Sequence, residues 1–285
     1  MAELQINLSA VLHNYRVYAT GGTVIPVLKD NAYGLGAAVI LRLLRQEGVR
    51  LFACATPEEA FHLAPHGVNL LLLSCVRDAD MLRRLLLQGV TLSVESLDQA
   101  KQIAALGIPA EVHLAVDTGF GRFGFLPDEI SDMQAVFSIP GVTVTGIYSH
   151  FRNSRSAPRQ FSLFRQVLDG LSDYPVGLRH IAASGTANHP DYRLDAVRIG
   201  SGLTGRLPGL EPASVLTGSI CSMRQLPRGS RISYAETRLH RDSLVAVIDI
   251  GTADGAFLHR QCGLRGWLRR HRVTVGGMDV PVLGS

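Results

Sequence analysis

The chain alternates short apolar runs with stretches of helical period, and this alternation repeats eight times before residue 200. Runs of four to eight apolar residues suit parallel strands that are buried on both faces. Eight β–α units of this kind predict a (β/α)8 barrel of the TIM type, in the α/β class. The expected strands are Thr23–Leu28, Leu51–Ala55, Leu70–Leu73, Thr91–Val94, Glu111–Val116, Val142–Ser149, His180–Ala183 and Ala196–Ile199.

The segments between these strands show helix periodicity, and several begin with good helix starters, such as Thr56-Pro57-Glu58-Glu59. The opening segment Ile6–Ala19 is expected to form a short strand that runs into a helix. The other expected helices are Ala37–Gln46, Pro57–Ala64, Asp78–Gln88, Ser96–Leu106, Pro127–Phe137 and Pro158–Leu168.

The pattern changes after Pro208, where Pro208-Gly209 and Glu211-Pro212 suggest a hinge. Strand-like runs without long helices follow, so we expect a barrel domain over residues 1–208 and a small, truncated β domain over residues 209–285. The expected strands of this second domain are Val215–Ser222, Ser230–Tyr234, Leu244–Ile250, Arg272–Val275 and Val280–Leu283.

Composition excludes several classes of protein. A net charge of +4 is too small and too scattered to indicate nucleic-acid binding. No run of 18 apolar residues exists, so no membrane span is expected, and the N-terminus lacks signal-peptide character. The cysteines have no metal-binding spacing and predict reduced thiols in a cytoplasmic protein without a metal: Cys54, Cys75, Cys221 and Cys262.

Lysine is rare in this chain. Of 28 basic residues only Lys29 and Lys101 are lysines. Arginine can replace lysine for solubility, but not where an amine must lose its proton and attack a carbonyl. Lys101 falls in an amphipathic helix and is expected to be solvated. Lys29 ends the first barrel strand, and a dry barrel mouth would disfavour its ammonium form, as a Schiff-base amine requires.

A set of motifs, in order along nearly the whole chain, resembles the alanine racemase family. Lys29 lies in a segment that resembles the lysine motif for pyridoxal phosphate (PLP) in that family. The motifs are Ile6–Arg16, Val27–Gly36, Val116–Gly124, Gly146–Phe151, Ala183-Ser184, Val197–Gly200, Ser233–Ala235 and Ile250–Gly255.

The resemblance implies a two-base racemase. Lys29 would hold PLP covalently and act as one base, and Tyr234 would be the second base, reaching the active site of the partner subunit in a homodimer. His150 would hydrogen-bond Tyr234. A proton is then removed from one face of Cα and delivered to the other. A tyrosine acts as a base only with cationic or hydrogen-bonding neighbours, which His150 and Arg198 would supply.

The resemblance also implies the remaining contacts. Arg198 would face the pyridine nitrogen of PLP, and because arginine cannot accept a proton the ring becomes a weaker electron sink, which suppresses transamination. Arg122 would lie near the substrate carboxylate. The phosphate would be held by Tyr33, Ser184 and the backbone at Gly200 and Ser201.

Three departures from the family pattern stand out. Ala115 replaces a lysine that is often carbamylated and steadies the arginine at position 122. Thr252 replaces a tyrosine. The chain ends at Ser285, before strands that carry a Met-Asp signature and a phosphate-binding tyrosine.

We therefore expect a PLP-dependent racemase of alanine or another small amino acid such as serine. A non-catalytic or degenerate PLP-binding homologue is the alternative. It is favoured by Ala115 and by the short C-terminal part of the chain. A decarboxylase of the same architecture is less consistent with the sequence, since its pyridine partner is normally acidic and Arg198 is not.

Overall fold

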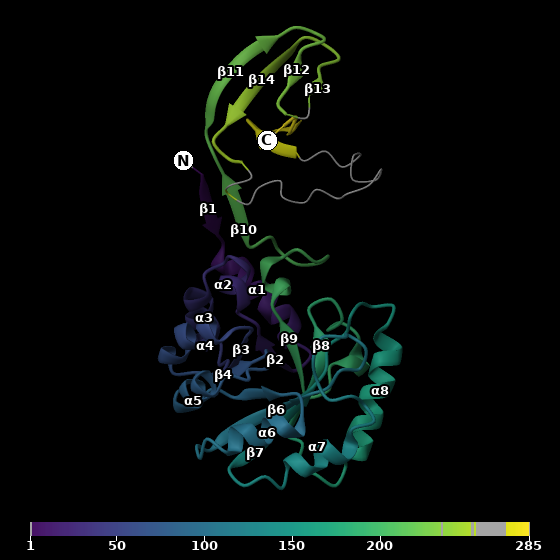
Figure 1. Ribbon diagram of the computed structural model, residues 1–285. Helices are drawn as coiled ribbons and strands as arrows, with labels where there is room; N and C mark the ends of the chain where they lie inside the picture. Colours follow the sequence, from purple (N-terminus) through teal and green to yellow (C-terminus); the bar gives the residue numbers. More distant parts are fainter. Residues whose placement is uncertain (1, 235, 252–253, 255–271, 285) are drawn as a thin grey trace. The chain divides into compact units, whose positions relative to one another are not determined.

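A computed structural model describes residues 2–234, 236–251, 254 and 272–284. It divides into two compact units, one formed by residues 6–214 and the other by residues 1–5 with 215–285 (Figure 1). Within the described residues, no helix is long and apolar enough to cross a membrane.

The larger unit is built on a closed ring of eight parallel strands. Six form one sheet in the order β2-β9-β8-β7-β6-β5, and β3 pairs with β4. Parallel bridges between Val27 and Ala53 and between Leu71 and Thr91 join the two pieces. The predicted barrel is thus confirmed. Its strands are β2 (Thr23–Pro26), β3 (Leu51–Cys54), β4 (Asn69–Leu72), β5 (Leu92–Val94), β6 (Ala110–Ala115), β7 (Val142–Tyr148), β8 (Leu178–Ala183) and β9 (Ala196–Ile199).

The barrel interior has an apolar side and a polar side. Ile25, Val27, Ala53 and Leu71 cluster with Ala196 on the apolar side. The polar side carries hydrogen-bonded side chains from β5 to β9, among them Ser93, His113, Tyr148, His180 and Arg198. Bonds between strands that are not neighbours, such as His113 on β6 with His180 on β8, require these side chains to point inward.

Helices connect the strands, mostly where the sequence predicts them. Thr56 and Glu59 form a capping box at α4, and Ser96 caps α6. One helix, α7, begins three residues later than predicted, because the Glu129 carboxylate accepts from Leu126 N and holds a turn there. The helices are α1 (Leu8–Ala19), α3 (Ala37–Gln46), α4 (Pro57–Leu63), α5 (Ala79–Leu87), α6 (Leu97–Ala104), α7 (Ile130–Val136) and α8 (Ala157–Gly170), with 3₁₀ turns η1 (Ala64–His66), η2 (Pro190–Tyr192) and η3 (Ser201–Thr204).

The buried Asn14 of α1 fixes the end of the barrel unit. Its amide donates to Leu203 O (3.2 Å) and Glu211 O (2.8 Å), and its Oδ1 accepts from Glu211 N (2.8 Å). These bonds tie residues 209–214 to the barrel unit, beyond the predicted boundary at 208. Residues 1–5 instead group with the second unit, since β1 (Glu3–Ile6) pairs with β10 (Ser214–Thr217).

The second unit consists of short antiparallel pairs. The expected strand Val215–Ser222 is interrupted at Gly218, and the expected strand Ser230–Tyr234 is shorter because Ser233 adopts φ 56° and begins a turn that contains Tyr234. Gly276-Gly277, both at positive φ, forms the predicted turn. The pairs are β11 (Ile220–Leu226) with β14 (Ser243–Ile248), β12 (Arg231–Ile232) with β13 (Thr237–Arg238), and β15 (Arg272–Val275) with β16 (Met278–Pro281).

Replacing Asn14 should destabilise the barrel unit. Asn14→Leu leaves two buried carbonyls and one amide without their partner, which should lower the free energy of unfolding by about 2–3 kcal/mol. Denaturant unfolding followed by circular dichroism measures this. Val17→Ala on the exposed face of the same helix is the control and should change it by less than about 0.5 kcal/mol. Equal effects of the two substitutions would contradict the assignment.

Candidate active site

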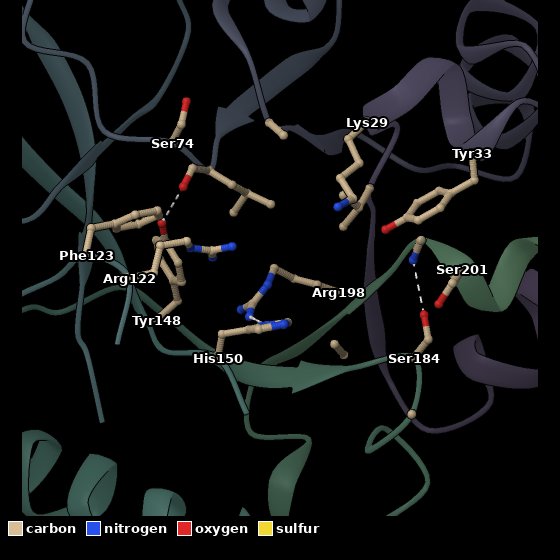
Figure 2. Close-up of a pocket in the computed structure, with 16 residues that line it drawn as sticks. Lys29, Tyr33, Ser74, Arg122, Phe123, Tyr148, His150, Ser184, Arg198 and Ser201 are labelled. Atoms are coloured by element: carbon tan, nitrogen blue, oxygen red, sulfur yellow. Dashed lines mark hydrogen bonds between the residues drawn. The ribbon is translucent and has the colours of Figure 1, made fainter. Parts of the chain in front are cut away.

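A cavity of about 390 Å³ opens at the carboxyl ends of the barrel strands (Figure 2). The residues that line it end or come shortly after strands β2, β3, β4, β6, β7, β8 and β9. This is the end of the barrel at which barrel enzymes place their chemistry. Eight of the nine predicted site residues line it: Lys29, Tyr33, Arg122, His150, Ser184, Arg198, Gly200 and Ser201. The ninth, Tyr234, belongs to the other unit, and its side chain is 97% exposed.

Lys29 begins a strained turn, α2 (Lys29–Tyr33). Residues 30–33 all have φ between 52° and 56°, a left-handed conformation that costs about 1–2 kcal/mol per residue outside glycine. Glu59 compensates, because its carboxylate accepts from Asp30 N (2.6 Å) and from Ala55 N (2.8 Å). Asn31 Oδ1 also accepts from Ala37 N (2.8 Å). The turn therefore fixes the directions of both Lys29 and Tyr33.

The Lys29 amine reaches the cavity but is not enclosed by this chain. Its side chain is 40% exposed, and its Nζ lies 3.8 Å from Asp30 Oδ2 and 5.5 Å from the centre of the Tyr33 ring. The expected dry environment is thus not provided by the described residues of a single chain. Figure 2 shows Lys29, Arg122 and Arg198 converging on the cavity from different sides.

Arg198 is the most constrained side chain of the site. It is 3% exposed, and its Nη atoms donate to Ser149 O (2.7 Å), His180 Nδ1 (2.5 Å) and His150 Nδ1 (3.1 Å). Burial lowers the pKa of Arg198 to about 10, so it stays cationic at neutral pH. Its Nε has no hydrogen-bond partner among the described residues. Since no carboxylate is among the described residues that line the cavity, this cation remains available to a ligand.

The bond from Arg198 defines the protonation of His150. An arginine only donates, so Nδ1 of His150 accepts and the ring proton of the neutral form sits on Nε2. Burial first, and then the charges of Arg198, Arg122 and Lys29, lower the pKa of His150 to about 3. His150 is therefore a neutral hydrogen-bond donor through Nε2 over the physiological pH range.

Small residues form an anion cradle beside Tyr33. Ser184 Oγ accepts from Gly200 N (3.2 Å) and Gly202 N (3.0 Å). A Cβ at Gly200 would lie 2.5 Å from the Tyr33 hydroxyl, so only glycine allows this close approach. Burial, assisted by Asp30 and Glu59, raises the pKa of Tyr33 and keeps its hydroxyl a donor. Backbone N–H groups and hydroxyls grouped in this way suit a phosphate.

Arg122 is positioned by a loop whose hydrogen bonds are not evident from the sequence. The Asp117 carboxylate accepts from the backbone N–H groups of residues 119–122 at 2.8–3.1 Å. The guanidinium lies 4.7 Å from the centres of both the Phe120 and Phe123 rings. Ala115 is buried, and no ion pair to Arg122 is found among the described residues. Among the described residues, aromatic contacts rather than an ion pair thus hold the Arg122 guanidinium.

Other lining residues were not predicted. Tyr148, Phe123 and Ser74 follow or end strands, so their position at strand ends was the available signal. His180 and Asp117 lie just outside the lining and support it. In the part of the chain that the structure covers, no group of three or more His, Cys, Asp or Glu could hold a metal ion. Thr252 lies outside the described residues.

Comparison with known proteins identifies the family. Residues 6–208 match the family described as alanine racemase, N-terminal domain. An alanine racemase of Desulforamulus reducens is 34% identical over 281 residues, covering 88% of this chain and 76% of that protein. A serine/alanine racemase of Enterococcus gallinarum is 30% identical over 88% of this chain and 40% of its own length. The chain belongs to the alanine racemase family.

Solved structures agree with this fold. The biosynthetic alanine racemase of Pseudomonas aeruginosa superposes with a TM-score of 0.87 at 28% identity, covering 99% of this chain and 82% of that one. The alanine racemase of Bartonella henselae, described with covalently bound pyridoxal phosphate, gives a TM-score of 0.82 at 27% identity with the same coverage. The cavity of the present chain fits such a cofactor, since an amine, a buried cation and an anion cradle face one space.

Removing the Asp117 carboxylate charge should loosen the Arg122 loop. Burial alone would raise the pKa of Asp117, but four backbone N–H groups outweigh it and lower the pKa below 3.8. The ionised carboxylate therefore stabilises the loop fully at neutral pH, and this stabilisation is lost as the pH falls below that value. In Asp117→Asn, amide hydrogen exchange at residues 119–122 should accelerate about tenfold or more, equivalent to about 1.4 kcal/mol.

Asp128→Asn is the matched control for this prediction, because Asp128 is an exposed acid on the same connection with no hydrogen bond from its side chain in the described structure. Exchange at residues 119–122 should not change in this control. Unchanged exchange in Asp117→Asn would show that the carboxylate does not hold the loop.

Proposed function

We propose that the protein is a PLP-dependent amino-acid racemase that interconverts L- and D-alanine, or another small amino acid such as serine. The observation that carries this proposal is the convergence of Lys29, Arg122, His150 and Arg198 on one cavity whose described lining contains no carboxylate. The family membership and the names of its relatives support the same reaction.

Different residues of the chain would bind the cofactor, orient the substrate and move the proton. When bound, PLP supplies a conjugated ring that takes up the electron pair left on the substrate Cα. Lys29 Nζ would hold the cofactor and move a proton at one face of Cα. Arg198 would hold the ring nitrogen as a donor and, because arginine cannot accept a proton, would leave that nitrogen unprotonated, which would disfavour transamination. Arg122 orients the substrate carboxylate, and the cradle of Tyr33 and Ser184 holds the phosphate.

Tyr234 would serve as the second base, at the opposite face of Cα and from a second copy of the chain. It lies fully exposed in the turn between β12 and β13, so its hydroxyl is free to enter another subunit's site. His150 presents Nε2–H as a donor, which would stabilise the deprotonated Tyr234 oxygen. Lys29, 40% exposed here, would be covered by the same partner.

Exposed apolar residues of the second unit support a homodimer. Met223 and Leu244 are 60% and 64% exposed, and the β11–β14 register places them on one face. Large apolar side chains gathered in this way are typical of interaction surfaces. A cytoplasmic location is part of the proposal, and the three free cysteines of the described chain agree with it.

Complementation between two inactive variants tests both bases at once. Lys29→Ala and Tyr234→Phe should each lose nearly all racemisation, and Tyr234→Phe should still bind PLP. Mixing them in equal amounts and allowing subunits to exchange should restore about one quarter of wild-type activity, since half of the dimers are mixed and each has one intact site. Chiral chromatography of alanine and, in parallel, serine measures the product.

The possible outcomes separate the alternatives. Full activity of Tyr234→Phe would refute the two-base assignment, and no recovery on mixing would refute the shared site. A cofactor absorption band that Lys29→Ala abolishes, without any D-product from wild type, would identify a cofactor-binding homologue without turnover.

A further inference from the structure

We infer that His113, buried in the barrel below the cavity, is a positioning residue that fixes the tautomer of His180 and so holds Arg198 at the cofactor ring. The inference rests on the proposed role of Arg198. His113 is not among the described residues that line the cavity, and its side chain is linked to Arg198 in the cavity lining through His180.

The donor and acceptor chemistry of the three groups allows one arrangement. Arg198 Nη1 can only donate, so His180 Nδ1, 2.5 Å away, accepts. A neutral His180 then carries its proton on Nε2, which lies 3.0 Å from His113 Nδ1. His113 Nδ1 is therefore the acceptor that the Nε2–H of His180 requires. Each proton position follows from the one before it, starting at Arg198.

Burial keeps the two histidines, His113 and His180, neutral. His113 is 3% exposed and His180 is fully buried. Desolvation first, and then the Arg198 charge, lower the pKa of His113 to about 4 and that of His180 well below its usual range. Neither ring competes with Arg198 for the positive charge. The titratable group that faces His180 from β7 is Tyr148, which stacks on its ring and has its pKa raised by burial, so it stays protonated.

The barrel is shaped to admit the His113 ring. The register between β6 and β7 slips after Val112, so that His113 pairs with Gly146 and Thr145 is skipped in the register with β6. A Cβ at Gly146 would lie 2.6 Å from Nδ1 and Nε2 of His113. The missing side chain at Gly146 thus leaves the space that the ring occupies, and from there the ring reaches His180 Nε2.

Without the acceptor at His113, His180 would lose the one Nε2 partner that the described residues provide. Moving the proton to Nδ1 would then place a donor against the Arg198 donor at 2.5 Å, and one of the two groups would have to move. Leucine at position 113 removes the acceptor. Asparagine keeps it, because its Oδ1 occupies the place of Nδ1 on the same Cγ.

Nitrogen-15 NMR of the histidine rings, on the full chain with and without PLP, tests the inference. The signals of His180 among the ten histidines are assigned by their loss in His180→Asn. Wild type and His113→Asn should show His180 as the neutral Nε2–H form. His113→Leu should show loss of that pure form. Turnover should fall at least tenfold in His113→Leu, mainly in kcat, and stay within about threefold of wild type in His113→Asn.

Each outcome decides the inference. A wild-type His180 with its proton on Nδ1, or doubly protonated, overturns it whether or not the variants fold. An unchanged His180 tautomer in His113→Leu also overturns it. If wild type shows the expected tautomer but forms no D-product, the proposed function fails while the link between His113 and Arg198 stands.

Discussion

The structure of this site depends on the burial of one cation, the guanidinium of Arg198. Taking an ion out of water costs several kcal/mol unless hydrogen bonds replace the lost hydration. Here backbone carbonyls and two neutral imidazoles supply those bonds, and no carboxylate in the described part of the chain cancels the charge. The positive charge is therefore left to act on what enters the cavity. A barrel with this interior is suited to a ligand that carries negative charge and a ring nitrogen able to accept a hydrogen bond.

The division of the barrel interior follows from this constraint. Strands β2 to β4 contribute apolar side chains that pack without polar partners, and strands β5 to β9 contribute the side chains that solvate Arg198 directly or through one another. The strained turn after β2 is stabilised by Glu59, which is itself fixed by a helix cap and accepts a hydrogen bond from Asp30 N. Rigid strands and a second layer of hydrogen bonds thus hold each functional side chain.

Much of this arrangement could be predicted from the sequence. The eight barrel strands appear as apolar runs, and because the carboxyl ends of parallel strands meet at one edge, residues such as Lys29, His150 and Arg198 were expected to lie together. The supporting residues were not predicted. His113 and His180 read as ordinary strand residues, since their bond joins strands that are distant along the chain, and the loop contacts of Asp117 depend on backbone geometry. Tyr234 remains a prediction, because its proposed place is in a second copy.

Racemisation of L-alanine in deuterated water tests the central claim most directly. Purified protein with PLP is sampled at early times, and chiral chromatography with mass spectrometry records the configuration and the hydrogen isotope at Cα. Two bases on opposite faces predict D-alanine that carries deuterium at Cα, because the delivering base exchanges with solvent. D-alanine that retains its original hydrogen would show that one base serves both faces, and the absence of D-alanine would contradict the proposed activity.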